Sequence, residues 1–307
     1  MKRFLFQLVK YLIILMILIC VPISVTSTLV KNKGFLNSET ESNLLFLKEK
    51  NEYDIAFLGI SQARNFSRHG NHDRVEGILN KKIVNLGQGG AVCGINEQLF
   101  YLDYFYSKKN TVKQLYYILP PQLMFSDTHP FATNTFDIEP FDMSFLTRYI
   151  FFDSENKYGR IHSYLRSKLE KKWLYYAPET KKKQTQVVEE IDYLSAKKKT
   201  LVDDTWSSRP DSDRFKKSKQ VLMKTIDLAL SHKTEIIFII PPNLLGTKRG
   251  LTKVYEFLKT MENIKGIKVY DFSQSVLNPE YYYDYHHLNS DGVIYFTENY
   301  LKNIRIK

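Results

Sequence analysis

"DIAFLGI", residues 54–60, is an apolar run of strand length that follows a single aspartate. A strand with apolar residues at consecutive positions is buried on both faces, as the strands of a parallel sheet are. Four later stretches have the same character: "KIVNLG" (82–87), "QLYYILPP" (114–121), "EIIFIIPP" (235–242) and "IKVYDF" (267–272). Helical stretches lie between or after them, at 92–107, 213–232, 250–262 and 290–303. This alternation predicts a three-layer α/β fold with a doubly wound parallel sheet of about five strands.

The N-terminal segment has the composition of a membrane anchor. Lys2, Arg3 and Lys10 precede "YLIILMILICVPISVTSTLV" (11–30), which carries no charge. About 20 apolar residues cross the core of a bilayer, and a basic flank favours the cytoplasmic side. A cleaved signal peptide is the alternative, although the usual apolar core of a signal peptide has only about 7–15 residues. We therefore expect a single-pass protein of the cell membrane whose C-terminal domain is extracytoplasmic.

The remaining chain divides into a stalk, an interrupted α/β domain and a large insertion after the third strand. The expected boundaries are 1–30 for the cytoplasmic tip and anchor, 31–50 for the stalk with a short helix, 51–121 and 213–307 for the α/β domain, and 122–212 for the insertion. Residues 131–152 are rich in aromatic side chains, which we expect to fill a core within the insertion. Lysine runs at 181–183 and 197–199 are expected to be solvated.

Composition limits the partners. The 44 Lys and Arg against 33 Asp and Glu give a net charge of +11, which suits a polyanionic neighbour such as a cell-wall polymer or anionic lipid. No zinc finger, RNP-like or helix-turn-helix signature is present, so nucleic acid is not an expected partner. Two cysteines, Cys20 and Cys93, exclude a disulfide framework. We expect Cys93 to be a small buried apolar residue.

Polar residues that directly follow the strands are the candidates for chemistry, because ligands of such sheets bind beyond the carboxyl ends of the strands. Ser61 stands at the turn from the first strand to a helix, and Gly87 and Gly90 follow the second strand. After the fifth strand, Asp284 and His287 are three residues apart. On one helical turn such residues are neighbours, so the carboxylate can hold the imidazole ring. His286 is expected to point elsewhere.

Three motifs together resemble the SGNH (GDSL-type) hydrolase superfamily, whose fold is flavodoxin-like. They are Ser61 after the first strand, the Asn85-x-Gly87-x-x-Gly90 turn after the second, and the late Asp284-x-x-His287 followed by Leu-Asn. The resemblance covers about residues 55–110 and 230–303. The anchor and the insertion are closer to the envelope branch of the superfamily, which includes proteins resembling the teichoic acid D-alanylation factor and polysaccharide O-acetyltransferases.

The resemblance implies a role for each matching residue. Ser61 would be the nucleophile, His287 the general base and acid, and Asp284 the residue that orients His287. The backbone N–H groups of Ser61 and Gly90 would be oxyanion-hole donors. No cofactor and no metal are implied.

Two departures from the superfamily pattern bear on activity. The Gly-Asp-Ser of the superfamily is Gly-Ile-Ser here, and "LPPQLMFSD" (119–127) replaces the Gly-x-Asn-Asp block. The missing Asn normally donates to the oxyanion, and losing such a donor costs about 2.7–4 kcal/mol of transition-state stabilisation. Gln122 is a candidate substitute. The loss favours acyl transfer from a pre-activated donor over efficient hydrolysis.

The expected function is therefore that of a serine-dependent acyltransferase or carboxylester hydrolase acting on an envelope polysaccharide or other polymer. The resemblance implies a membrane-bound O-acyltransferase as a partner that delivers the acyl group. A catalytically silent scaffold or binding module of a polymer-modification complex is the alternative. In that case Ser61 would simply cap a helix, Asp284 would belong to a turn and Asn289 would be a helix cap.

A second polar cluster, "RHGNHD" (68–73), has the residue types of a metal site. Its candidate ligands are His69, His72 and Asp73. Gly70 and Asn71 favour a loop there, and no complementary group of convincing spacing follows in the sequence, so we do not predict a metal site.

Overall fold

The computed structural model describes residues 1–34, 49–88, 93–126, 132–137, 139–170, 183–189, 194, 213–246 and 250–304. Its strands are β1 (Glu52–Gly59), β2 (Ile83–Asn85), β3 (Thr111–Ile118), β4 (Glu235–Ile240) and β5 (Ile267–Asp271). Its main helices are α1 (Lys2–Gly34), α2 (Ser61–Arg64), α3 (Asn71–Leu79), α4 (Ile95–Ser107), α5 (Met143–Phe151), α6 (Lys157–Leu169), α8 (Asp213–Ser231), α9 (Leu251–Met261) and α10 (Ser290–Asn299).

The five strands form one parallel sheet in the order β2-β1-β3-β4-β5, which confirms the predicted five-stranded parallel α/β fold. β1 pairs with β2 on one side and with β3 on the other. The chain therefore changes its winding direction at β1, and such a switch point is where parallel sheets bind ligands.

Two strands end earlier than the apolar pattern predicts, because prolines follow them. β3 ends at Ile118, before Pro120 and Pro121, and β4 ends at Ile240, before Pro241. Proline has no N–H to donate to a strand ladder, so the apolar runs continue beyond the pairing.

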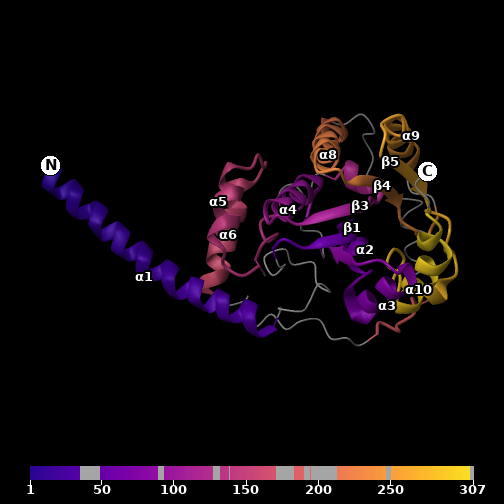
Figure 1. The fold of residues 1–307 in the computed structure, drawn as a ribbon, viewed down its shortest axis with the longest axis horizontal. Helices are drawn as coiled ribbons and strands as arrows, with labels where there is room; N and C mark the ends of the chain where they lie inside the picture. The colour runs from indigo at the N-terminus through magenta and orange to yellow at the C-terminus, as the bar shows by residue number, and fades with distance from the viewer. Residues whose placement is uncertain are drawn as a thin grey trace.

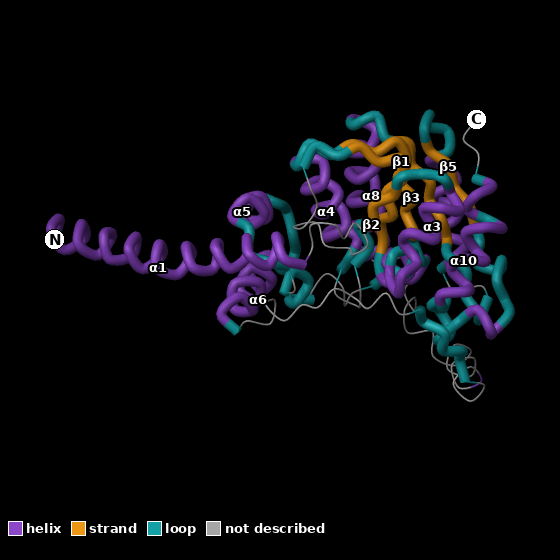
Figure 2. The backbone as a smooth tube through the Cα atoms, turned by 60° about the horizontal axis from the view of Figure 1, so that its bottom comes forward, coloured by secondary structure: helices purple, strands orange, loops and turns teal. Residues whose placement is uncertain are grey.

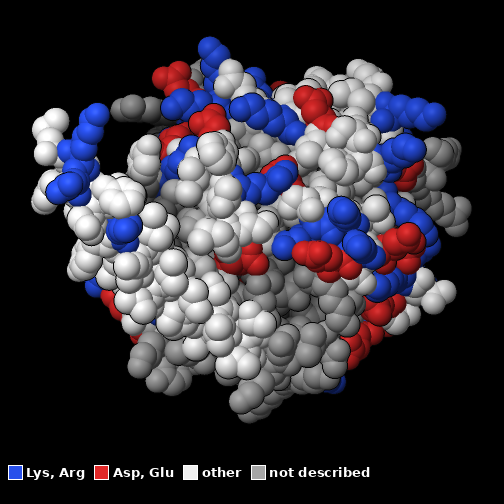
Figure 3. Space-filling view, turned by 60° about the vertical axis from the view of Figure 1, so that its left-hand side comes forward, with Lys and Arg blue, Asp and Glu red and all other residues white. Residues whose placement is uncertain are grey.

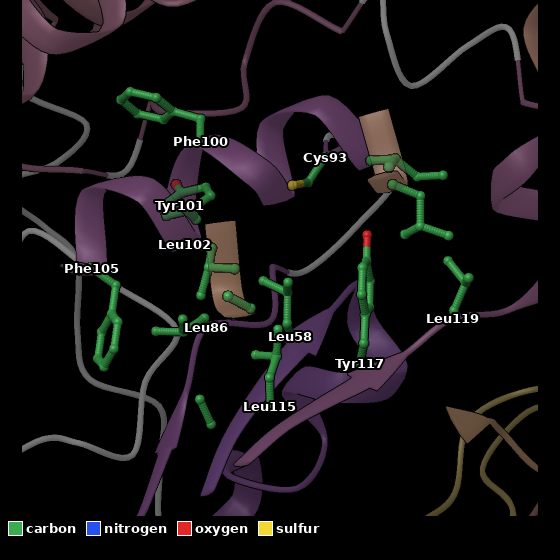
Figure 4. Packing of buried hydrophobic residues seen from close by; sticks show 14 of the residues in the cluster. Leu58, Leu86, Cys93, Phe100, Tyr101, Leu102, Phe105, Leu115, Tyr117 and Leu119 are labelled. Carbon is green, nitrogen blue, oxygen red and sulfur yellow. The ribbon is translucent and has the colours of Figure 1, made fainter. Parts of the chain in front are cut away.

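Alternate residues of β1 face two separate apolar layers. Ala56 and Leu58 belong to the larger cluster with α4, α8 and α9, while Ile55 and Phe57 face the layer with α3 and α10. Figure 1 shows these helices around the sheet. Figure 4 shows aromatic and aliphatic side chains of α4 above the strands, with Cys93 beside them. Cys93 is fully buried, which confirms the prediction of a small buried apolar residue.

The aromatic part of the insertion joins the main core instead of forming a core of its own, so that prediction is wrong. Phe136, Phe145 and Tyr149 contact Phe100 of α4 edge-on, with ring centroids 4.8–5.9 Å apart. Edge-to-face pairs of this kind contribute about 0.5–1.5 kcal/mol beyond the burial of their area. The hairpin of α5 and α6 is thereby attached to the sheet through α4.

α1 projects away from the sheet, with the N-terminus farthest from it (Figures 1 and 2). Its Lys2–Leu29 part is long and apolar enough to cross a membrane, with a mean hydropathy of 2.6. A core helix or a signal sequence can share these properties, so length and composition alone are weak grounds for a membrane span. The predicted short helix of the stalk, residues 39–50, lies outside the described residues except for 49 and 50, which form a bend.

Candidate active site

Ser61 stands at a sharp turn between β1 and α2. Gly59, the last residue of β1, has φ of +147°, and a Cβ there would lie 2.5 Å from the carbonyl oxygen of Ile118. Only glycine fits this backbone conformation beside β3. The turn places Ser61, which is partly exposed, as the first residue of α2 at the carboxyl end of the sheet.

Asp284 and His287 lie in a loop closed by an isolated antiparallel bridge between Tyr282 and Leu288. Within the loop, Asp284 Oδ1 accepts the backbone N–H groups of His286 and His287, each at 2.8 Å. The expected helical turn is therefore wrong, because a carboxylate-capped turn brings the two side chains together. In the helical turn and in the capped turn alike, Asp284 precedes His287 by three residues.

The structure brings the side chains of Ser61, His287 and Asp284 into one hydrogen-bonded row. His287 Nε2 lies 2.6 Å from Ser61 Oγ, and His287 Nδ1 lies 2.7 Å from Asp284 Oδ2. A carboxylate accepts only, so Nδ1 carries the proton and donates it to Asp284. Nε2 is then left to accept the hydroxyl proton of Ser61, as a general base must.

Neighbouring groups hold this row in place. The ring of Tyr283 stacks on that of His287, with centroids 5.3 Å apart and an interplanar angle of 1°. Asn65, just after α2, donates through Nδ2 to the carbonyl oxygen of Leu288 at 3.2 Å. The serine turn and the histidine loop, 226 residues apart in sequence, are thus tied together by a second, buried hydrogen bond. Asn65 and Tyr283 could not be predicted from the sequence, since neither has a spacing signal.

The charge state of Asp284 follows from its partners. Burial acts to raise its pKa, but the hydrogen bond from His287, the charges of His286 and His287, and the backbone N–H of His286 together lower the pKa to about 2. Asp284 is therefore a carboxylate at neutral pH, which is the form that can orient an imidazole.

His286 does not point elsewhere, so that expectation is wrong. Its Nδ1 lies 3.3 Å from Asp284 Oδ1, and its ring centroid is 3.9 Å from that of His287. In a helix, adjacent residues point about 100° apart, whereas this turn directs both rings to one carboxylate. By residue type and proximity, Asp284, His286 and His287 could hold a metal ion, since their ligand atoms lie within 4.8 Å of one another.

The turn after β2 supports α2 from the other side. Asn85 donates through Nδ2 to the carbonyl oxygen of Ala63 at 2.8 Å and accepts the N–H of Gly87 at 2.8 Å. A Cβ on Gly87 would lie 2.7 Å from the backbone nitrogen of Arg64, so the close approach requires glycine. The candidate oxyanion donor Gly90 falls outside the described residues.

Gln122 lies beside the serine turn. It follows β3 in the short helix η3 (Pro121–Met124) and lines a small cavity together with Gln62, the residue after Ser61. The cavity measures about 10 Å³, which suits about one water molecule. The Oε1 atoms of Gln62 and Gln122 are buried there and accept no hydrogen bond.

The cluster at 68–73 is only partly a loop. Residues 68–70 form a single helical turn, and Asn71 begins α3. His72 is buried and turns its Nδ1 to Ser67 Oγ at 3.1 Å and its Nε2 toward Glu76 at 3.7 Å. These contacts tie α3 to the turn before it and give His72 a structural role.

Part of the insertion is hydrogen-bonded to the residues that flank the loop of Asp284 and His287. In residues 183–189, the N–H of Val188 donates to the carbonyl oxygen of Tyr282 at 2.8 Å. The N–H of Gln184 donates to Ser290 Oγ at 2.9 Å, and Asn289 Nδ2 donates to the carbonyl oxygen of Gln186 at 3.2 Å. This strap therefore lines the loop that holds Asp284 and His287. Asn289 also caps α10, because its Oδ1 accepts the N–H of Gly292.

Comparison with models of protein families gave no match, and a search of curated proteins found no matching sequence.

Proposed function

We propose that this protein is a membrane-anchored, extracytoplasmic SGNH-like acyltransferase or esterase that modifies a cell-envelope polysaccharide or polymer. The observation that carries the proposal is the contact of His287 Nε2 with Ser61 Oγ at 2.6 Å, with Asp284 held at the other ring nitrogen. Nucleophile, base and orienting carboxylate in this order form the arrangement of serine acyl transfer.

The proposed reaction is a double displacement. Ser61 Oγ attacks an ester or thioester carbonyl while its proton passes to His287 Nε2. The tetrahedral intermediate collapses, the leaving alcohol or thiol takes the proton from Nε2, and an acyl ester remains on Ser61. A hydroxyl of the acceptor, or water, then gives its proton to Nε2 and attacks the ester, which returns the proton to Ser61.

The oxyanion requires donors, and two backbone groups and one side chain are candidates. Ser61 begins α2, and the first N–H groups of a helix have no partner within it. Gly90 is the second candidate, from the resemblance of its turn to the superfamily motif. Gln122 is the third, because it lies after β3, where the superfamily places its Asn block, and lines a cavity with Gln62.

The proposed setting is the outer face of the cell membrane. α1 has the length and hydropathy of a span, and Lys2, Arg3 and Lys10 favour a cytoplasmic N-terminus. Acyl transfer outside the cytoplasm needs a donor delivered across the membrane, and a membrane-bound O-acyltransferase is the proposed source. The strap at 183–189 is the proposed wall for the acceptor, because it borders the His287 loop.

The test is an acyl-transfer assay on the purified full-length protein with an activated acetyl ester, with and without glycan. We expect Ser61-dependent acetyl release that is slow in water and faster with glycan, with acetyl found on the glycan. Ser61→Ala should lower the rate by on the order of 10⁴-fold or more. Release to water alone, equal with and without glycan, would identify a hydrolase.

A silent scaffold is the second candidate, favoured by the absent Gly-x-Asn-Asp block and by the small size of the cavity that Gln62, the residue after Ser61, lines. It predicts an acetyl release rate that is the same in wild type and in Ser61→Ala. It also predicts that the variant still supports polymer modification in cells, which a catalytic Ser61 does not allow.

A further inference from the structure

The hairpin of α5 and α6 carries two exposed apolar stripes. On α5, Met143, Ile150 and Phe151 are 51%, 44% and 84% exposed, and they recur at helical spacing. On α6, the exposed apolar residues are Tyr158, Leu165 and Leu169, at 85%, 39% and 65%. Both helices bury their opposite sides, through Phe145 and Tyr149 on α5 and Tyr164 on α6. Two neighbouring amphipathic helices with aromatic and aliphatic outer stripes are typical of a surface that contacts another apolar phase.

Two arginines at the edges of the stripes are paired, whereas the exposed His162 lies within the stripe of α6, between Tyr158 and Leu165. Arg148 of α5 forms an ion pair with Asp103 of α4, and Arg166 of α6 forms one with Glu170. Figure 3, which turns the side with α1 forward, shows the largely uncharged surface along α1 at its lower left, while charged residues gather at the top and right.

The position of the hairpin along α1 identifies what covers these stripes. Cys20, Ile23 and Ser27 occupy one face of α1 and are covered there, and Thr26 beside them is partly covered. Cys20 and Ile23 pack against the main core, and Ser27 Oγ accepts the N–H of Phe141, just before α5. Figures 1 and 2 both show α6 beside this C-terminal part of α1.

Helix length then fixes the level of the bilayer. A helix rises about 1.5 Å per residue, so the 30 Å hydrocarbon core takes about 20 residues. If the span begins near Lys2, it ends near Cys20–Ile23; if it begins after Lys10, it ends near Val30. With the first placement, the contacts of α1 lie at the outer boundary of the hydrocarbon or just outside it. With the second, they lie within its outer half, from about 5 Å deep at Ser27 to about 15 Å deep at Cys20.

We propose that α5 and α6 lie on the outer leaflet of the bilayer that α1 crosses and insert Phe151, Tyr158 and the neighbouring apolar residues into it. The inference rests on the membrane setting of the proposed function and is independent of the serine chemistry. Because the hairpin is fixed to α4, this second membrane contact adds to the packing of α1 in holding the catalytic domain at one orientation and height.

The test is depth-dependent fluorescence quenching in proteoliposomes at low protein density, with Trp173 and Trp206 replaced by Phe. One tryptophan is introduced per variant: Phe151→Trp, Tyr158→Trp, Leu15→Trp within α1, and Leu277→Trp, which is 52% exposed on the α/β domain. Lipids brominated near the headgroup should quench Phe151→Trp and Tyr158→Trp at least about twofold, because interfacial helices insert about 5–10 Å. Leu277→Trp should be unaffected, and Leu15→Trp should respond to lipids brominated deep in the chains.

Quenching of Leu15→Trp without quenching of either hairpin variant would overturn the proposal while leaving the anchor in place. Cross-linking of Phe151→Cys, in a Cys20→Ser background, to a second copy or to a membrane protein would then name the occupant instead. Absence of quenching at Leu15→Trp would overturn both the proposal and its premise that α1 crosses the bilayer. In all variants, fluorophosphonate reactivity of Ser61 reports separately on the proposed chemistry.

Discussion

At the scale of the residue, the site depends on how one carboxylate is shared. Asp284 accepts two backbone N–H groups through Oδ1 and the imidazole of His287 through Oδ2. It therefore fixes both the loop and the ring that reaches Ser61. His286 adds a second imidazole beside Oδ1.

The lowered pKa of Asp284 predicts a pH dependence of stability. Its value of about 2 in the folded protein lies below the ordinary 3.8, so the ionised form stabilises the fold. This contribution is complete above about pH 4 and is lost as the pH falls toward 2. Since Asp284 is about one-third exposed, we expect it to be worth on the order of 1 kcal/mol.

The measurement is the thermal midpoint of the detergent-solubilised protein from pH 5 to pH 2.5. Wild type should lose more than Asp284→Asn over this range, so that the difference between them narrows as the pH falls. Parallel curves for the two proteins would show that Asp284 makes no such contribution.

The residues of the candidate site could be predicted from the sequence, but the orientation of His286 could not. Ser61, Asp284 and His287 could be selected because each follows a strand end in the order of a known motif. The orientation of His286 could not, since it depends on whether 284–287 form a helical turn or a capped loop. That choice follows from the Tyr282–Leu288 bridge, whose partners have no distinguishing sequence pattern.

At the scale of the element, one buried ion pair attaches the hairpin to the sheet. Arg160 of α6 and Glu97 of α4 are 0% and 1% exposed, and their charged atoms lie 2.9 Å apart. Burial raises the pKa of Glu97, and the charge of Arg160 opposes that shift. Arg160 also donates to Thr135 and Ser154, and its loss would leave the buried carboxylate of Glu97 without its opposite charge.

Arg160→Met should therefore lower the free energy of unfolding by about 3–5 kcal/mol. Arg148→Met is the matched control, because it breaks a more exposed ion pair, with Asp103, that also joins the hairpin to α4. This variant should cost at most about 1 kcal/mol. Urea denaturation followed by circular dichroism measures both. Equal losses in the two variants would contradict the role assigned to the buried pair.

The elements of the sheet could be predicted from apolar runs because each strand is buried on both faces. Strand ends could be placed less well, since Pro120 and Pro241 stop the pairing while the apolar run goes on. The packing of the insertion could not be predicted. Phe145 and Phe151 are the same residue type on the same helix, yet Phe145 is buried against Phe100 and Phe151 is 84% exposed.

At the scale of the whole molecule, the winding of the sheet explains why distant residues meet. β1 is the switch strand, so the turn after it lies at the carboxyl edge of the sheet, between the elements that follow β2 and β3. The loop between β5 and α10 returns to that edge, and the strap at 183–189 closes one side of it. The C-terminal part of α1, the hairpin and the site are thus packed together, with α1 in contact with the main core.

The most direct test of the central claim is covalent labelling of the full-length protein by a fluorophosphonate, with the modified residue located by mass spectrometry. We predict one phosphonyl group on Ser61, none in Ser61→Ala, and a labelling rate at least about 10³-fold lower in His287→Ala. Ser67→Ala is the matched control, since Ser67 also contacts a histidine but is buried, and it should label like wild type. Labelling at another residue, or at the same rate without His287, would contradict the account.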